Sequence, residues 1–453
     1  MEAIMSTRSL QQLKGLFFCL FAGFLVFHAP YIHAQRKETI TINLGAKKIV
    51  LPSDNAAAGV SLSIADLGTD HVPELIVGDG LGSKPRVHAL RQDGTEIGNF
   101  LAFDKNMTSG INVSACDLGN DGVNEIIVTP QRGGGPHLRV FSNAGKPIDN
   151  GGVFAYDKSF MQGMNLACGD LDDDGISEIV TLPGAGSSSD IKIWNLEKGN
   201  LKLKQQFFAF DASDEKGFVG VVHDKQLSIA EQQTKNPIVR TYVIHSPAKL
   251  ISEKNILLSH IGVASLFIHN DHLFLSTTND GTIIDTTSDA KQVFKEPYGS
   301  VIASESDLHN DGKKELIIAP SKHQFDESTD DQTVIVDTSN QRLFAYANGI
   351  LENTFLVSTS KEKNGTPLGI HHILEKIQTV HYAWNYGAND KRNYDLGWVP
   401  FNLRFAPHIY LHYAPWHNNF GYRMTHGCVN IGLEHMKWLY AWAHVNTTVD
   451  VKI

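Results

Sequence analysis

Cys428 and the histidines near it are the residues of this chain whose types favour covalent chemistry. Cys428 directly follows His426 and Gly427, and His412 lies about a dozen residues before that group. A cysteine attacks a carbonyl carbon only as its thiolate, so it needs a neighbouring base or positive charge. His412 and His426 are the candidates for the base, and the N–H groups of Gly427 and Cys428 are candidates for an oxyanion hole. The alternative is a buried cysteine with an unrelated histidine nearby, because the chain contains 21 histidines.

The elements around these residues are expected to bring them together. Residues 407–416 resemble a strand in composition and carry His412 near their end. A Gly- and Asn-rich loop follows, and Cys428 opens the next element, so the loop can fold the cysteine back toward the histidine. A helical stretch and a short strand complete the chain. This order of elements favours a Cys–His nucleophile.

The same region resembles the catalytic domain of the L,D-transpeptidase (YkuD) family. The family signature is a histidine, a loop, and then Ser/Thr-His-Gly-Cys-x-Asn/Arg, which matches His412 followed by residues 425–430, THGCVN. The stretch HYAPW, which ends at Trp416, is most similar to the subgroup first known from mycobacterial wall enzymes. A predicted β-hairpin over residues 333–360, with an Asn-Gly turn, supports the same match. The resemblance covers residues 332–453 and implies a β-rich domain with a short helix after the cysteine.

The resemblance assigns a role to each residue of the motif. Cys428 matches the acylated nucleophile, and His412 matches the general acid and base, which the backbone carbonyl of Tyr413 orients. The positions that support the loop and the peptide groups of the substrate are matched by Thr425, His426, Gly427 and Asn430. Trp416 matches an aromatic residue of the subgroup, and ordinary packing is its alternative role. The resemblance implies no metal or organic cofactor for catalysis.

The implied reaction is acyl transfer on the stem peptides of peptidoglycan. Cys428 attacks the carbonyl of the third residue of a tetrapeptide, the terminal D-Ala leaves, and an amine of a neighbouring stem resolves the thioester. The product is a 3→3 cross-link, or a protein attached through its lysine. The alternatives are an L,D-carboxypeptidase, in which water is the acceptor, and a wall-binding protein with a decayed catalytic domain. The aromatic-rich residues 379–405 are interpreted as a lid over the substrate, with a packed insertion as the alternative.

A repeated motif fills the first two thirds of the chain. The frame Asp-Leu-x-x-Asp-Gly-x-x-Glu, followed by apolar residues, begins at Asp66, Asp117, Asp170 and Asp307, with His71 in place of the Gly in the first copy. The first three copies lie about 50 residues apart, with short alternating strands between them, which is typical of propeller blades. With two worn copies, residues 37–320 hold about six units, which resemble the FG-GAP/VCBS repeats of integrin-like β-propellers. The predicted fold is therefore mainly β, with an N-terminal propeller, a linker over residues 321–331 and the catalytic domain.

The Asp-rich loops of such repeats hold Ca²⁺ in the family that they resemble. Calcium takes six to eight oxygen ligands, which closely spaced carboxylates around a tight glycine turn can supply. Only the third copy offers the full set, which is Asp170, Asp172, Asp174 and Glu178. We therefore predict a structural calcium site in this loop. The alternative is that the Asp-Gly pairs only form hairpin turns.

Three cysteines remain once the N-terminal segment is set apart. Cys116 and Cys168 occupy neighbouring positions in two copies of the repeat. They form a disulfide between adjacent units, or they remain two small buried side chains, and both alternatives stay open at this point. Cys428 has no partner in either case, which fits a nucleophile.

The N-terminus and the composition indicate an exported protein. Residues 1–34 carry Arg8 and Lys14 before an uncharged apolar run, which is the anatomy of a cleaved signal peptide, with an uncleaved anchor as the alternative. The 453 residues have a formal net charge of -10, which argues against nucleic acid as a partner. We expect a protein of the periplasm, the cell wall or the extracellular space, whose propeller binds a wall protein or glycan.

Overall fold

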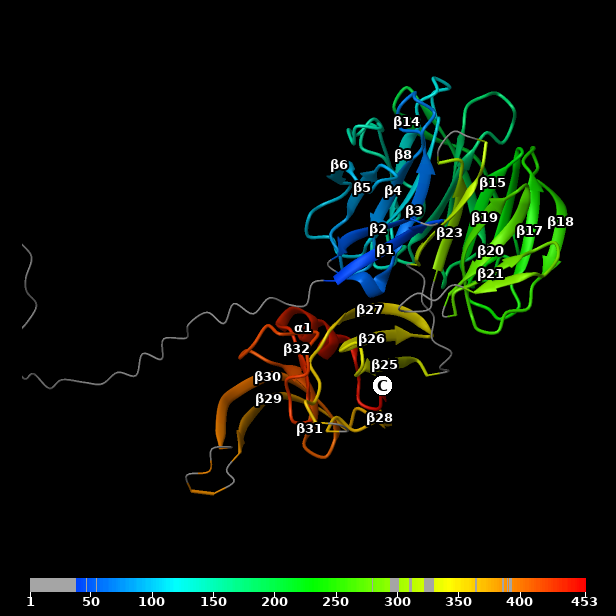
Figure 1. The fold of residues 1–453 in the computed structure, drawn as a ribbon. Helices are drawn as coiled ribbons and strands as arrows, with labels where there is room; N and C mark the ends of the chain where they lie inside the picture. The colour runs from blue at the N-terminus through cyan, green and yellow to red at the C-terminus, as the bar shows by residue number, and fades with distance from the viewer. Residues whose placement is uncertain are drawn as a thin grey trace, which may run out of the picture.

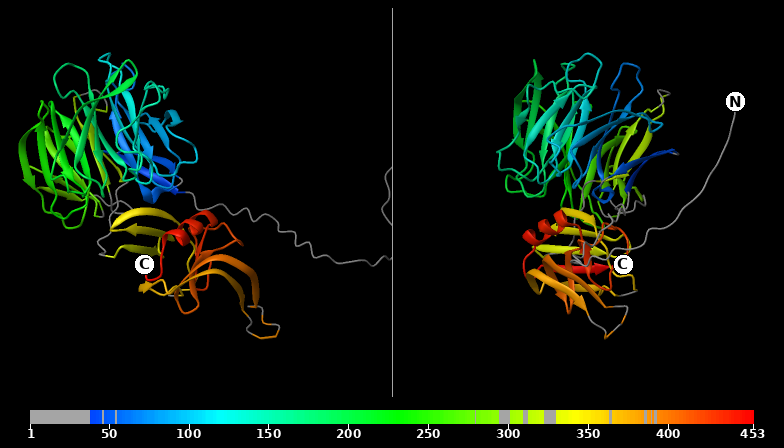
Figure 2. Two further views of the ribbon diagram at one scale, coloured as in Figure 1. Left: turned by 180° about the vertical axis from the view of Figure 1, so that it is seen from behind. Right: turned by 90° about the vertical axis from the view of Figure 1, so that its left-hand side faces the viewer.

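The computed structural model describes residues 38–453 except residues 46, 54, 279, 294–300, 309–311, 322–329, 363–364, 385–386, 389 and 391–392. The predicted signal peptide, residues 1–34, lies outside the described residues. The described residues are mainly β, with one short 3₁₀ helix (Ala56–Ala58) and one α-helix, α1 (Leu433–Trp442). Neither helix of the described part has the length and apolar character that a membrane span requires. The strands fall into two regions, which Figures 1 and 2 show one above the other.

The first region, residues 38–321, consists of six antiparallel sheets of four strands each, and we call it the six-sheet region (Figure 1). The first sheet contains β3 (Val60–Ala65), β4 (Glu74–Asp79), β5 (Arg86–Leu90) and β6 (Glu96–Leu101). The second contains β7 (Ile111–Cys116), β8 (Glu125–Pro130), β9 (His137–Phe141) and β10 (Val153–Phe154). The third contains β11 (Met164–Gly169), β12 (Glu178–Pro183), β13 (Asp190–Glu197) and β14 (Asn200–Phe208).

The remaining three sheets complete the region. The fourth contains β15 (Phe218–His223), β16 (Gln226–Glu231), β17 (Ile238–Val243) and β18 (Lys249–Asn255). The fifth contains β19 (Val263–His269), β20 (His272–Thr277), β21 (Thr282–Asp285) and β22 (Lys291–Val293). The sixth combines β23 (Val301–Ser306) and β24 (Glu315–Pro320) with the N-terminal strands β1 (Glu38–Leu44) and β2 (Lys47–Ser53), because β1 pairs with β24. Six sheets agree with the six repeat units predicted from the sequence.

The six sheets surround a shared cavity. One edge strand of each sheet lies beside that of the next sheet, in the order β3, β7, β11, β15, β19 and β23. The last of these, β23, lies beside β3 again. All six of these strands line one cavity of about 360 Å³. Polar side chains on these six strands form hydrogen bonds to the backbone of the neighbouring sheet. Ser61 Oγ donates to the carbonyl of Ile111 at 2.9 Å, and Asn165 Nδ2 donates to that of Phe218 at 2.7 Å.

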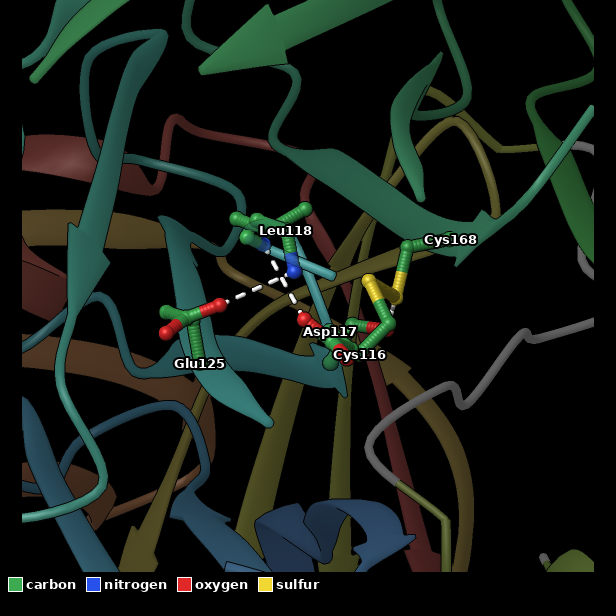
Figure 3. The surroundings of a disulfide bond; sticks show 7 residues. Cys116, Asp117, Leu118, Glu125 and Cys168 are labelled. Carbon is green, nitrogen blue, oxygen red and sulfur yellow. Dashed lines mark hydrogen bonds between the residues drawn. A yellow bond between two sulfur atoms is a disulfide. The ribbon is translucent and has the colours of Figure 1, made fainter. Parts of the chain in front are cut away.

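The Asp and Glu residues of the repeated motif close the hairpin loops through hydrogen bonds. Asp117 Oδ2 accepts the backbone N–H of Gly122 at 2.8 Å. Glu125 Oε2 accepts the N–H of Leu118 at 2.9 Å, a bond that Figure 3 shows, and Glu74 and Glu178 make the same bond in their own copies. These bonds satisfy loop N–H groups that would otherwise lack a partner inside the protein. Loop closure therefore accounts for the recurrence of the motif.

Cys116 and Cys168 form a disulfide (Figure 3). Cys116 ends β7 and Cys168 lies in β11, so the bond joins the second sheet to the third. Of the two alternatives that the sequence left open, the structure therefore has the disulfide. Cys428 is the free cysteine of the described residues.

The second region, residues 330–453, contains two sheets and α1. One sheet has the order β27 (Ile350–Leu356), β26 (Arg342–Ala347), β25 (Gln332–Asp337), β33 (Thr448–Lys452) and β28 (Gly369–His372). The other has the order β29 (Glu375–Trp384), β30 (Tyr394–Ala406), β31 (Ile409–Tyr413) and β32 (Val429–Ile431). A buried core joins both sheets to α1, with Val336, Leu411 and Met436 among its members. The predicted hairpin and the predicted helix after Cys428 are both present.

The β26–β27 hairpin of the second region contacts the six-sheet region. Its turn is formed by Asn348 and Gly349, whose φ angles of 49° and 74° are those that a tight hairpin of this kind requires. At its other end Arg342, which is 1% exposed, pairs with Glu38 of β1 and donates to Asn55 Oδ1 at 2.7 Å. Apolar side chains from both regions complete the contact, namely Ala57, Leu81, Phe344, Tyr346 and Leu351. Most of the predicted linker, residues 321–331, lies outside the described residues.

Candidate active site

Cys428 and His412 lie on neighbouring strands of the four-stranded sheet. β31 and β32 are parallel, and their register places His412 opposite Asn430. Cys428 directly precedes β32, so the same register places it beside Tyr410. Alternate residues of a strand point to the same face of the sheet. The side chains of Tyr410, His412, Cys428 and Asn430 therefore share one face, with the two predicted reacting groups on neighbouring strands.

His412 is buried, with 1% of its surface exposed, and the backbone orients its ring. Nδ1 lies 2.6 Å from the carbonyl oxygen of Tyr413, so Nδ1 carries the proton and Nε2 is left as an acceptor. Burial lowers the pKa of His412 to about 4, although the bond to Tyr413 opposes this effect. A neutral imidazole with an accepting Nε2 is the form that can take a proton from a thiol. The contact with Tyr413 agrees with the orientation that the resemblance implied.

The Cys428 thiol is half-buried and protonated at neutral pH. Burial raises the pKa of this thiol to about 11, and a hydrogen bond from the backbone of Tyr410 reduces the shift. Sγ lies 3.8 Å from the carbonyl oxygen of His408, an acceptor that favours the protonated thiol. Both side chains are therefore neutral in the resting protein. An attack of this sulfur on a carbonyl carbon would need a base to take the thiol proton.

The Thr425 hydroxyl closes the loop that carries Cys428. Thr425 Oγ1 donates to the carbonyl oxygen of Cys428 at 2.6 Å and accepts the N–H of Gly427 at 3.1 Å. The sequence predicted this N–H of Gly427 as an oxyanion donor, and in this structure the Thr425 hydroxyl accepts it. A Cβ atom on Gly427 would lie 2.6 Å from Ile409 Cδ1 and 2.9 Å from the oxygen of Gly365. Close packing is therefore the reason for glycine at this position.

Aromatic side chains surround the pair, and the motif predicted only one of them. Tyr382 of β29 stacks on the His412 ring, with centroids 4.4 Å apart and planes 27° apart. Burial raises the pKa values of Tyr382 and Tyr410, and an ionised Cys428 would raise them further. The Trp416 ring lies 5.7 Å from that of His412. The aromatic content of the predicted lid was the only signal for Tyr382.

The stretch interpreted as a lid forms the long β29–β30 hairpin, which extends away from the rest of its region in Figure 1. Parts of its tip lie outside the described residues. Tyr382 belongs to this hairpin and contacts His412, so the hairpin contributes one wall of the site. Trp398, on the opposite strand of the hairpin, is 72% exposed. The contact through Tyr382 fits both a lid and a packed insertion, so the lid stays a prediction.

His426 and Asn430, the predicted supporting residues, differ in their surroundings. The side chain of His426 is exposed to solvent. Asn430 is buried, and its side-chain amide lies 3.0 Å from Nε2 of His417. Its backbone also forms a bridge with Ser358, so Asn430 is held from two sides. No motif in the sequence pointed to His417, because nothing in its spacing distinguishes it from the other histidines.

The predicted calcium ligands come together only in part. Oxygen atoms of Asp170, Asp172 and Asp174 lie within 4.8 Å of one another. Glu178 is not among them, because its buried carboxylate accepts a backbone N–H of its own loop and lies 2.7 Å from Lys204 Nζ. Lys204 also lies 2.6 Å from Asp172 and already supplies positive charge to this loop. The prediction of Glu178 as a ligand is wrong, and calcium at the three aspartates stays a prediction.

Comparisons with known proteins address the second region of the chain. Residues 331–451 match the family model of the L,D-transpeptidase catalytic domain, which confirms that domain. Among similar solved structures is an L,D-transpeptidase from Enterococcus faecium, with 21% identity over 27% of this chain and 50% of that one and a TM-score of 0.25. The enzyme from Stackebrandtia nassauensis has 25% identity over 28% of this chain and 58% of that one, with a TM-score of 0.24. The enzyme from Mycobacterium smegmatis has 16% identity over 52% of this chain and 93% of that one, with a TM-score of 0.26. The chain spans about half the length of the Enterococcus protein. A comparison with curated protein sequences gave no match.

Proposed function

We propose that the protein is an exported L,D-transpeptidase that forms an acyl-enzyme on Cys428 with peptidoglycan stem peptides. The observation that carries this proposal is the shared face of β31 and β32, where Cys428 and His412 lie on adjacent strands. The bond between His412 Nδ1 and Tyr413 leaves Nε2 able to accept the thiol proton. The match to the catalytic-domain family supports the class of reaction.

The first half-reaction releases the terminal residue of the donor peptide. The sulfur of Cys428 attacks the carbonyl carbon of the third stem residue while the thiol proton passes to His412 Nε2. The carbonyl of Tyr413 stabilises the imidazolium that forms, and the N–H of Cys428 is the predicted donor to the oxyanion. His412 then returns the proton to the amine of D-Ala, which leaves, and a thioester remains on Cys428.

The second half-reaction regenerates the thiol. An acceptor amine gives a proton to His412 and attacks the thioester, and the Cys428 sulfur leaves as the new amide forms and takes that proton back from His412. The acceptor is the side-chain amine of a neighbouring stem, or the lysine of a protein that becomes attached to the wall. The reaction needs no cofactor, because the proton moves only between His412, the thiol and the two amines.

The test is the mass of the products formed from purified tetrapeptide muropeptides. A transpeptidase yields a dimer that lacks one D-Ala, whereas a carboxypeptidase yields a monomer that lacks D-Ala. Cys428→Ala is the matched control, because it removes the sulfur with little change in volume, and it should yield neither product. A parent protein that forms only the shortened monomer would establish the carboxypeptidase instead. Equal product from Cys428→Ala would refute the nucleophile.

We also infer that the six-sheet region is a closed propeller that attaches the enzyme to the cell wall. Two observations support a closed ring of sheets. The strand β23 lies beside β3, and one strand from each of the six sheets lines the same cavity. The pairing of β1 with β24 supports it too, because it joins the first strand of the region to the last. Full-length Cys428→Ala protein should sediment with purified wall sacculi. Binding that persists after protease treatment of the sacculi indicates a glycan ligand, binding that is lost indicates a wall protein, and no binding to either refutes the attachment.

A further inference from the structure

His417 lies in the loop between β31 and Cys428 and has no part in the mechanism above. The residue is 8% exposed, and its ring packs on Phe420 with centroids 5.2 Å apart. Nδ1 lies 3.1 Å from the backbone nitrogen of Asn419, and Nε2 lies 3.0 Å from the side-chain amide of Asn430. Both ring nitrogens are therefore engaged within the protein.

The contact with Asn419 determines which nitrogen carries the proton. A backbone N–H can only donate, so Nδ1 of His417 is the acceptor and has no proton of its own. The neutral ring then carries its proton on Nε2, which donates to Asn430. A side-chain amide accepts a hydrogen bond only through its oxygen, and the bonding network decides which of its two ends faces a partner. The structure places Nδ2 of Asn430 beside Nε2 of His417, and two donors cannot bond to each other. The bonding network therefore assigns Oδ1 to that position and turns the NH₂ group of Asn430 away from His417.

That NH₂ group belongs to the face of the sheet that carries the candidate active site. Asn430 lies opposite His412 in the register of β31 and β32, and it follows Cys428 by two positions on the same face. Asn430 is 4% exposed, and Ser358 pairs with its backbone, so the side chain has little freedom to move. Two N–H donors held beside His412 and Cys428 suit a carbonyl oxygen of a bound peptide.

We propose that His417 is a positioning residue that orients the Asn430 amide, so that Asn430 presents its NH₂ group to a backbone carbonyl of the stem peptide. This inference rests on the proposed function, because it names a peptide as the ligand. Without the Nε2–H of His417, the amide can turn by 180° and present its oxygen, which repels a carbonyl. His417 itself touches no reacting atom and exchanges no proton with the substrate.

The contact between His417 and Asn419 also makes the orientation of the Asn430 amide sensitive to acidic pH. A proton on Nδ1 would face the N–H of Asn419 and break that contact. Burial lowers the pKa of His417, and the charge of Lys361 lowers it further. His412 is the other titratable group that His417 faces. Because the pKa is lowered, the contact persists below the ordinary titration range of histidine and is lost only at more acidic pH.

Two variants separate this role from a merely structural one. In His417→Gln the amide nitrogen takes the place of Nε2 and still donates to Asn430. In His417→Asn the amide oxygen takes the place of Nδ1 and still accepts from Asn419, but the side chain is too short to reach Asn430. We expect His417→Gln to keep the rate at which a tetrapeptide acylates Cys428 near that of the parent. We also expect this variant not to lose acylation rate at acidic pH. We expect His417→Asn to lose about 10- to 100-fold, as is typical when a residue that orients a ligand group is removed. The opposite ranking would overturn the proposal.

Asn430→Asp and an NMR measurement complete the test. The aspartate can accept from Nε2–H of His417 but has no N–H to offer, so its acylation rate should fall as far as that of His417→Asn. The tautomer of His417, read from the ¹⁵N shifts of its ring in the full-length parent, requires no activity. A proton on Nε2 supports the proposal and a proton on Nδ1 overturns it. A parent that shows the Nε2–H tautomer and yet is not acylated refutes the proposed function instead.

Discussion

Removal of the Arg342 guanidinium should strongly weaken the contact between the six-sheet region and the catalytic domain. Arg342 is 1% exposed and Glu38 is 9% exposed, so both charges of this pair are withdrawn from water. Arg342→Met leaves the Glu38 carboxylate buried, with the N–H of Ala56 at 2.9 Å as its remaining partner among the described contacts. Loss of one member of a buried ion pair costs about 3–5 kcal/mol, because the other charge stays uncompensated. We therefore expect Arg342→Met to lower the free energy of unfolding by about this amount.

Urea denaturation of the mature full-length protein measures this loss. Arg404→Met is the matched control, since it breaks a partly exposed pair with Glu375 at 3.0 Å, and it should cost less than about 1 kcal/mol. Addition of Glu38→Met to Arg342→Met removes the isolated buried charge and should recover much of the lost stability. Equal losses from Arg342→Met and Arg404→Met would refute the account. A double variant that is no more stable than Arg342→Met would refute it as well.

Three further predictions concern other parts of the chain. Burial lowers the pKa of His435 on α1 to about 4, so the unfolded chain takes up the proton first and stability should fall as pH drops from about 6.5 toward 4. His435→Phe should reduce that slope in urea titrations over the same pH range, and an unchanged slope would contradict the assignment. Asp172→Asn with Asp174→Asn should abolish any rise in melting temperature that Ca²⁺ causes, and a parent that Ca²⁺ does not stabilise would exclude the site. Replacement of Cys116 and Cys168 by serine should cost about 2–5 kcal/mol under oxidising conditions, and a parent whose stability is unchanged by reduction would contradict the disulfide.

The candidate reacting groups could be predicted from the sequence because a short motif contains most of the loop. Thr425, Gly427 and Cys428 are neighbours in the chain, so their local bonds follow from a few adjacent residues. His412 lies only one loop away, at the end of a predicted strand. The Asn-Gly turn of the β26–β27 hairpin was equally local, because both residues must adopt positive φ. Local patterns of this kind also gave the number of sheets, through the spacing of the repeat.

The remaining contacts depend on register and docking between distant segments. Tyr382 reaches His412 only because β29 and β31 flank β30 in one sheet, and no spacing in the sequence specifies that alignment. Arg342 meets Glu38 across the contact between the two regions, where either residue alone resembles an ordinary surface charge. Glu178 was wrongly predicted as a calcium ligand because its residue type suits the metal. Its burial and its bond to the N–H of its own loop appear only in three dimensions.

The most direct test of the account is the rate of Cys428 acylation against pH for His412→Gln and His426→Gln, with a carbapenem as the acyl donor and the adduct mass as the readout. We propose that His412, which is buried on the strand next to Cys428, accepts the thiol proton, so His412→Gln should slow acylation by about 10²- to 10⁴-fold. His426 is exposed to solvent, so His426→Gln should have a smaller effect. A His412→Gln variant that keeps the acylation rate of the parent while His426→Gln loses it would contradict the assignment of the base.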